Sequence, residues 1–117
     1  MGKKAVRKKL LDIIIQAAES KKAENIVVLD VQKQKAICDY LVIASGGSAP
    51  QLRAIIREIE AKVKEAGVVS RLFEGNISSG WVILDLGTIV VHVMSEEERA
   101  YYNLEKLWGQ GAVFYHV

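Results

Sequence analysis

A turn early in the chain carries the residue types that could hold a phosphate. Residues 39–56 read "DYLVIASGGSAPQLRAII", an apolar stretch followed by Gly46, Gly47 and Ser48 and then a helical pattern. A strand, a glycine turn and a helix N-terminus can together present backbone N–H groups to an anion. Two hypotheses follow: the Gly46–Ser48 turn binds a nucleotide, or it only redirects the chain while Ser48 caps the helix.

The carboxylates do not provide the metal site that a nucleotidyltransferase would need beside such a turn. That chemistry requires two or three acids around Mg²⁺, which binds both the attacking and the leaving oxygen. Glu58 and Glu60 lie at a suitable distance after Ser48, but two helical positions are separated by about 200°, so these side chains point apart. The other acids near strand ends occur singly: Asp30, Asp39 and Asp85. We therefore expect no catalytic residue, no metal and no cofactor, with nucleotide binding kept as an alternative function.

Other catalytic chemistry lacks its residues. His92 and His116 are too few for a zinc site without cysteine ligands or an H-E-x-x-H spacing. Cys38 is the only cysteine, so the chain has neither an internal disulfide nor a cysteine metal cluster. We expect His92 to be a half-buried strand residue and Cys38 to be a small buried apolar one.

Composition indicates one folded domain, residues 1–117. Of the 117 residues, 50% are hydrophobic and 26% charged, which suits a single sheet with a few helices. No apolar run reaches the roughly 18 residues of a membrane span. The N-terminus "MGKKAVRKKLLDIII" begins like a signal peptide, but Asp12 interrupts it and no small-residue cleavage site follows. We expect a cytoplasmic protein that does not bind membranes.

Apolar periodicity predicts the elements that position these residues. We expect a helix over residues 4–20, strands over 26–31 and "DYLVIAS", and a helix over 48–66. Ser48 and Gln51 have the spacing of a capping box at the start of that helix, and Gly67 ends it. Three extended pieces follow, the last two joined around Gly87 as an antiparallel hairpin. A final helix, "EEERAYYNLEKLW", is opened by the capping residues Ser95 and Glu98.

The element order α-β-β-α-β-β-β-α predicts an α/β fold, a mixed sheet with helices packed mainly on one face. In "WVILDL", Val82 and Leu84 share one side while Trp81, Ile83 and Asp85 share the other. On the next strand the corresponding side carries Val90, His92 and Met94.

If both long helices cover one face, the Trp81 side is left to the short final helix or to a partner protein. Strand geometry nominates Asp85 and Met94 as partner-binding residues on that side. The alternative is that Tyr101, Tyr102 and Trp108 fold back over it and form an ordinary second core.

The chain resembles the ribosomal silencing factors, or Iojap-related family, from about Leu10 to Trp108. The segments "AENIVVLDV", "DYLVIASGGS", "EG" at Glu74–Gly75, "GWVILDLGTIVVHVM" and "YNLEKLW" carry the resemblance, in the same order and spacing. It implies a nucleotidyltransferase-like fold without the metal-binding acids, hence no enzymatic activity. It further implies binding to the fourteenth protein of the large ribosomal subunit, at the intersubunit face. Occupation of that site sterically blocks joining of the small and large subunits and represses translation when nutrients are short.

The resemblance assigns partner binding to Trp81, Tyr102 and Lys106. The sequence departs from the family pattern at Thr88, where the family usually has an acid. If that acid pairs with a basic group of the ribosomal protein, this chain must bind without the pair. The N-terminal bases can make a peripheral contact with ribosomal RNA phosphates: Lys3, Lys4, Arg7, Lys8 and Lys9. The tail "AVFYHV" can add an edge strand or support self-association. A dimeric adaptor, a homodimer joined through the Trp81 side, is a further alternative.

Overall fold

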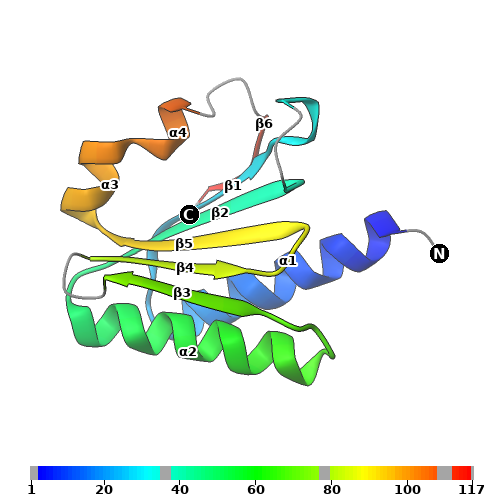
Figure 1. The fold of residues 1–117 in the computed structure, drawn as a ribbon, viewed down its shortest axis with the longest axis horizontal. Helices are drawn as coiled ribbons and strands as arrows, with labels where there is room; N and C mark the ends of the chain where they lie inside the picture. Colours follow the sequence, from blue (N-terminus) through cyan, green and yellow to red (C-terminus); the bar gives the residue numbers. More distant parts are fainter. Residues whose placement is uncertain (1–2, 35–37, 77–79, 108–111, 117) are drawn as a thin grey trace.

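The computed structural model describes residues 3–34, 38–76, 80–107 and 112–116 (Figure 1). Their elements, in chain order, are α1 (Lys3–Ser20), β1 (Glu24–Asp30), the 3-10 helix η1 (Gln32–Gln34), β2 (Tyr40–Gly46), α2 (Ala49–Glu65), β3 (Arg71–Asn76), β4 (Trp81–Asp85), β5 (Ile89–Ser95), α3 (Glu96–Tyr102), α4 (Leu104–Leu107) and β6 (Ala112–His116).

All six strands belong to one sheet, in the order β3-β4-β5-β2-β1-β6. β2 and β5 are parallel and the other neighbours are antiparallel, so the predicted mixed sheet is confirmed. The β4–β5 hairpin around Gly87 is confirmed as well. The C-terminal tail forms β6, which pairs with β1 as an edge strand of the sheet. This is one of the two roles predicted for the tail.

Helices α1 and α2 lie together on one face of the sheet, whereas α3 and α4 lie on the other (Figure 1). The main core fills the space between the sheet and the two long helices. Helix α2 contributes Leu52, Ile55, Ile56, Ile59 and Val63, the stripe that its periodicity predicts. Full burial of each such side chain stabilises the fold by about 1.5–3 kcal/mol. Among the described residues, none of the helices is long and apolar enough to cross a membrane.

The Gly46–Ser48 turn is occupied by contacts within the chain. The Ser48 hydroxyl accepts the Gln51 backbone N–H at 3.2 Å, which confirms it as the N-cap of α2. In a capping box the Gln51 side chain would accept the N–H of Ser48 itself. Here its Oε1 accepts the N–H of the preceding residue, Gly47, at 2.6 Å. A Cβ on Gly46 would come within 2.9 Å of Leu52 Cδ2, so this glycine allows the turn to pack closely on α2.

The prediction of one continuous final helix was wrong. Helix α3 ends at Tyr102, and Asn103 adopts a left-handed conformation with φ of 44°. Asparagine tolerates this conformation because its short side chain can hydrogen-bond locally. Here the Asn103 Oδ1 accepts the Lys106 backbone N–H at 3.2 Å, so the residue that ends α3 also caps α4. Trp108, expected at the end of this helix, lies outside the described residues.

Candidate functional site

The sheet face opposite α1 and α2 is only partly covered. Its buried cluster is drawn mainly from β1 and β2 and includes Val27, Leu29, Val31, Cys38, Leu41, Ile43 and Met94. Leu104 of α4 packs against this cluster, together with Trp81 and Val90, which are themselves only partly buried. The face therefore has a dry half on β1 and β2 and a half-open margin on β4 and β5.

Trp81 is fixed in place on this margin. It begins β4 and pairs with Met94 of β5. Its indole Nε1–H donates a hydrogen bond to Nδ1 of His92 at 3.0 Å, and its ring centroid lies 4.7 Å from that of Tyr102 at an interplanar angle of 50°. Such a tilted contact between aromatic rings is favourable and directional. The indole is therefore held from the sheet below and from α3 beside it.

His92 is the acceptor that sets the orientation of the indole. Burial lowers the pKa of His92 from 6.5 to about 4, so the ring is neutral at pH 7. Since an indole N–H can only donate, Nδ1 of His92 must carry a lone pair, and the ring proton must sit on Nε2. His92 is a partly buried strand residue, as predicted, whereas its hydrogen bond to Trp81 was not predicted.

Tyr101 and Tyr102 are the exposed part of the surface. Their side chains are 82% and 50% exposed, and their rings meet edge to face with centroids 5.0 Å apart. They do not form the second core of the alternative prediction. The buried cluster on this face contains Met94 instead, and Leu104 packs against it. We define the Trp81 surface as Trp81, His92, Tyr101 and Tyr102. Tyr101 was not among the predicted partner-binding residues, although two consecutive tyrosines on a short polar helix are typical of an interface.

Helix α3 is anchored to the sheet at its N-terminal end. Ser95 caps it by accepting the Glu98 N–H at 3.2 Å, as predicted, and the Ser95 N–H donates to the Gly80 carbonyl at 2.8 Å. The Arg99 guanidinium donates to Oγ of Ser45 at 2.8 Å. Gly80 has φ of +80° and would place a Cβ 2.7 Å from Ser95 Oγ, so only glycine fits just before Trp81. These contacts position Tyr102 against the indole.

The two residues nominated from strand geometry are not among the exposed aromatic residues around Trp81. Met94 is 0% exposed, so its side chain supports Trp81 from beneath and cannot touch a partner in this conformation. Alternation placed it correctly on the face, but α4 covers that part of the face. Asp85 lies at the other end of β4 from Trp81, roughly 13 Å away. Its Oδ1 accepts the Gly87 N–H at 2.8 Å and so stabilises the hairpin turn.

The basic residues expected to contact the partner protein or ribosomal RNA lie on helices. Lys106 is exposed on α4, the short helix that follows the Trp81 surface. Lys9 is exposed on α1. The side chains of Lys3, Lys4, Arg7 and Lys8 lie outside the described residues, although their backbone belongs to α1.

Two features of the described residues bear on the nucleotide alternative. No group of three or more His, Cys, Asp or Glu side chains within 3–34, 38–76, 80–107 and 112–116 is arranged to hold a metal ion. The Gly47 N–H, which a phosphate would need, is already bonded to Gln51. Cys38 is buried as expected, and burial raises the pKa of its thiol, which disfavours the reactive thiolate.

Comparisons with known proteins agree on one family. The family model described as "Ribosomal silencing factor during starvation", RsfS, matches residues 4–114. A Bacillus subtilis protein named "Ribosomal silencing factor RsfS" is 44% identical over 103 residues, which cover 88% of this chain and 87% of that protein. A crystal structure of a Chromobacterium violaceum protein superposes with a TM-score of 0.83 at 37% identity and covers 87% of this chain and 85% of that one.

A second solved structure, from Bacillus halodurans, has a TM-score of 0.75 at 43% identity and covers 86% of this chain and 94% of that one. A more distant mouse protein, "Mitochondrial assembly of ribosomal large subunit protein 1", is 32% identical over 101 residues, 84% of this chain and 44% of that protein. Since the family model spans nearly the whole chain and the solved structures share its fold, the chain belongs to the RsfS family of ribosomal silencing factors.

Proposed function

We propose that this chain uses the Trp81 surface to bind the fourteenth protein of the large ribosomal subunit and thereby keeps the small subunit from joining. The observation that carries the proposal is an aromatic cluster that is held rigidly and yet left open: Trp81 fixed by His92, with Tyr102 half exposed beside it. Membership of the silencing-factor family supports the ribosome as the target, and the name of the mouse relative supports its large subunit.

The energetics suit a steric role. Buried tryptophan and tyrosine anchors dominate many protein interfaces, each contributing about 2 kcal/mol or more. A standard interface buries about 800 Å² per partner, which is compatible with micromolar to nanomolar affinity. An inhibitor that occupies a docking site needs no turnover, so no catalytic residue or cofactor is required. We further propose that the protein acts in the cytoplasm, where it represses translation.

Two additional contacts belong to this proposal. Lys106, exposed on α4, can pair with an acidic group at the edge of the interface. The basic N-terminal segment from Lys3 to Lys9 can touch ribosomal RNA phosphates, a contribution that weakens as salt rises. Both contacts would adjust the affinity, whereas the aromatic anchors supply most of it.

The decisive experiment mixes the protein with purified large and small subunits and follows whole-ribosome formation by sedimentation. We expect the protein to cosediment with large subunits and to reduce joining, and we expect Trp81→Ala or Tyr102→Ala to weaken both effects by at least about tenfold. Val69→Ala is the matched control, since Val69 is 87% exposed and lies in the loop after α2, on the other side of the sheet. Circular dichroism verifies that each variant is folded.

Three results would contradict the proposal. One is full activity of Trp81→Ala that has retained its fold. Another is a homodimer joined through the Trp81 surface that persists in the presence of large subunits, because one surface cannot serve both contacts. The third is micromolar binding of ATP, CTP or GTP with Mg²⁺ by calorimetry, lost in a Ser48 variant, together with no effect on subunit joining.

A further inference from the structure

Within the described part of the chain, strand β3 leaves one edge of the sheet unpaired. It is the terminal strand of the order β3-β4-β5-β2-β1-β6 and pairs on one side with β4 alone. Its register with β4 is regular from Arg71 to Phe73 and shifts between Phe73 and Asn76. An edge strand presents unpaired backbone N–H and C=O groups, which form a template for a further strand. The regular half of β3, Arg71–Phe73, is the part suited to this pairing.

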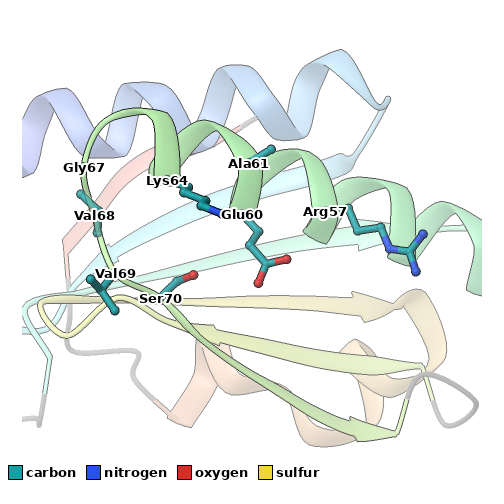
Figure 2. A pocket seen from close by; sticks show the side chains of 8 residues that line it. All are labelled: Arg57, Glu60, Ala61, Lys64, Gly67, Val68, Val69 and Ser70. Carbon is teal, nitrogen blue, oxygen red and sulfur yellow. The ribbon is translucent and has the colours of Figure 1, made fainter.

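A groove runs beside the start of this edge. It is lined by one flank of α2, with Arg57, Glu60, Ala61 and Lys64, and by the chain from Gly67 to Ser70 that leads into β3 (Figure 2). Figure 2 shows Glu60 extending from α2 toward the chain that leads into β3. Val69 is 87% exposed, the most exposed large apolar side chain of the described residues. A solvent-facing valine beside a free strand edge is a place for an apolar side chain of a partner.

The charges around the groove are unbalanced. Arg57 and Lys64 line it, Arg53 lies one helical turn before Arg57, and Arg71 begins β3; all four are exposed. Glu60 is the only acid among the described residues that line it. Within the described part of the chain, none of these five side chains makes a hydrogen bond or an ion pair. Exposed cations without a partner among the described residues favour a ligand with negative charge.

We propose that this groove binds an extended, acidic peptide segment of a partner protein, which adds to the sheet as a strand beside β3. The peptide backbone pairs with Arg71–Phe73, one of its apolar side chains rests on Val69 and Ala61, and its carboxylates lie beside Arg57 and Lys64. Strand addition of this kind takes affinity from main-chain hydrogen bonds and specificity from side-chain pockets.

A protein segment fits these features better than a nucleic acid does. A free strand edge presents alternating N–H and C=O groups, which an extended peptide backbone can pair with and a sugar–phosphate backbone cannot. The groove is also separate from the Trp81 surface, because α2 lies on the opposite face of the sheet (Figure 1). A peptide can therefore bind while the Trp81 surface is engaged, and the inference does not depend on the proposed function.

The test selects from a display library of random peptides about as long as β3, using the full chain as bait. An Arg57→Glu/Lys64→Glu double variant serves for counter-selection. We expect enrichment of sequences that alternate acidic and apolar residues. A synthetic copy of an enriched peptide should bind with an affinity that falls by about tenfold or more in Arg57→Glu. Trp81→Ala should bind it as the original chain does.

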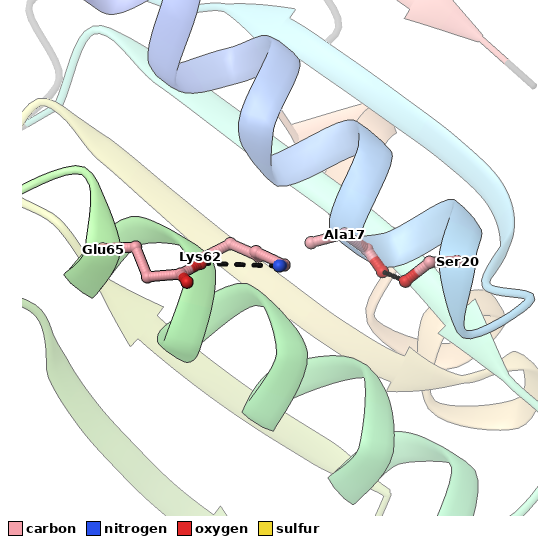
Figure 3. A network of polar contacts seen from close by, with 4 residues as sticks. All are labelled: Ala17, Ser20, Lys62 and Glu65. Carbon is pink, nitrogen blue, oxygen red and sulfur yellow. Dashed lines mark hydrogen bonds and ion pairs between the residues drawn. The ribbon is translucent and has the colours of Figure 1, made fainter.

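Lys62→Glu provides the matched control. Lys62 lies on the other flank of α2, toward α1, where it forms an exposed ion pair with Glu65 at 3.4 Å (Figure 3). The same charge change on the same helix should alter peptide affinity by less than about twofold. Amide hydrogen exchange should show new protection at Arg71–Phe73 when the peptide is bound, because only strand addition satisfies those edge groups.

Four outcomes would overturn the inference. The first is a selection without acidic enrichment. The second is equal affinity in Arg57→Glu and Lys62→Glu. The third is binding of a single-stranded RNA oligonucleotide that depends on Arg57 and leaves β3 unprotected, which would assign the groove to nucleic acid. The fourth is a homodimer that Arg57→Glu dissociates, which would assign the edge to a second copy of the chain.

Discussion

Successive side chains of the five-residue strand β4 point to opposite faces of the sheet, and the two faces differ in how far they are buried. Val82 and Leu84 are 0% exposed beneath α1 and α2, whereas Trp81 and Ile83, their immediate neighbours, remain partly exposed. The first side is a finished core. The second side is buried only over β1 and β2, where Leu104 of α4 packs against it, and the remaining margin on β4 and β5 carries the aromatic residues. The difference indicates that one side of the sheet stabilises the fold while the other retains area for a partner.

The largest expected effect is a difference in the free energy of unfolding between substitutions on the two sides of β4. Leu84→Ala should lower the free energy of unfolding by about 2–5 kcal/mol, because it removes a fully buried side chain and leaves a cavity. Ile83→Ala, on the partly exposed side, should cost clearly less. Chemical denaturation measures both, and equal losses would mean that the Trp81 side is as closed as the helix-covered side.

A second prediction uses the pH dependence of stability. The pKa of His92 is about 4 in the folded chain against 6.5 when unfolded, so between these values the unfolded state binds a proton that the native state does not. Stability should therefore fall as the pH drops from 6.5 to 4, by up to about 3 kcal/mol from this residue. Denaturation curves across this range measure the slope.

His92→Asn is the control for this titration. The asparagine Oδ1 can accept the Trp81 N–H much as Nδ1 does, but the side chain does not titrate. The variant should lose the part of the slope that His92 contributes. If the slope is unchanged in His92→Asn, other groups dominate acid destabilisation and the margin around Trp81 is wetter than the structure indicates.

The smallest expected effect concerns the anchor of α3. Ser45 is fully buried and accepts a hydrogen bond from Arg99, which ties α3 to β2. Ser45→Ala should reduce stability by about 1 kcal/mol. It should also weaken large-subunit binding a few-fold, since Tyr102 would be less firmly placed against Trp81. Ser70→Ala, a partly exposed serine before β3, is the matched control. Unaltered binding in Ser45→Ala would show that Gly80 and Ser95 suffice to position the helix.

Local patterns predicted α2 and the β4–β5 hairpin well because their signals lie within a few residues. Ser48, the apolar stripe and Gly67 mark α2 from inside its own segment. The break at Asn103 was missed because asparagine does not by itself end a helix. The break follows from a left-handed conformation that Leu104 reinforces by packing onto the far side of the sheet. That contact joins residues distant in sequence, which periodicity does not report.

The sequence by itself determined which residues share a face. Period-two alternation in β4 and β5 places Trp81, Ile83, His92 and Met94 on one side of the sheet whatever lies above them. Only the tertiary structure decided that Met94 is buried, that Trp81 is held by His92, and that Tyr101 and Tyr102 stay open. The physical reason is that alternation is a property of the extended backbone, whereas cover depends on where α3 and α4 come to rest after the chain has closed its long-range contacts.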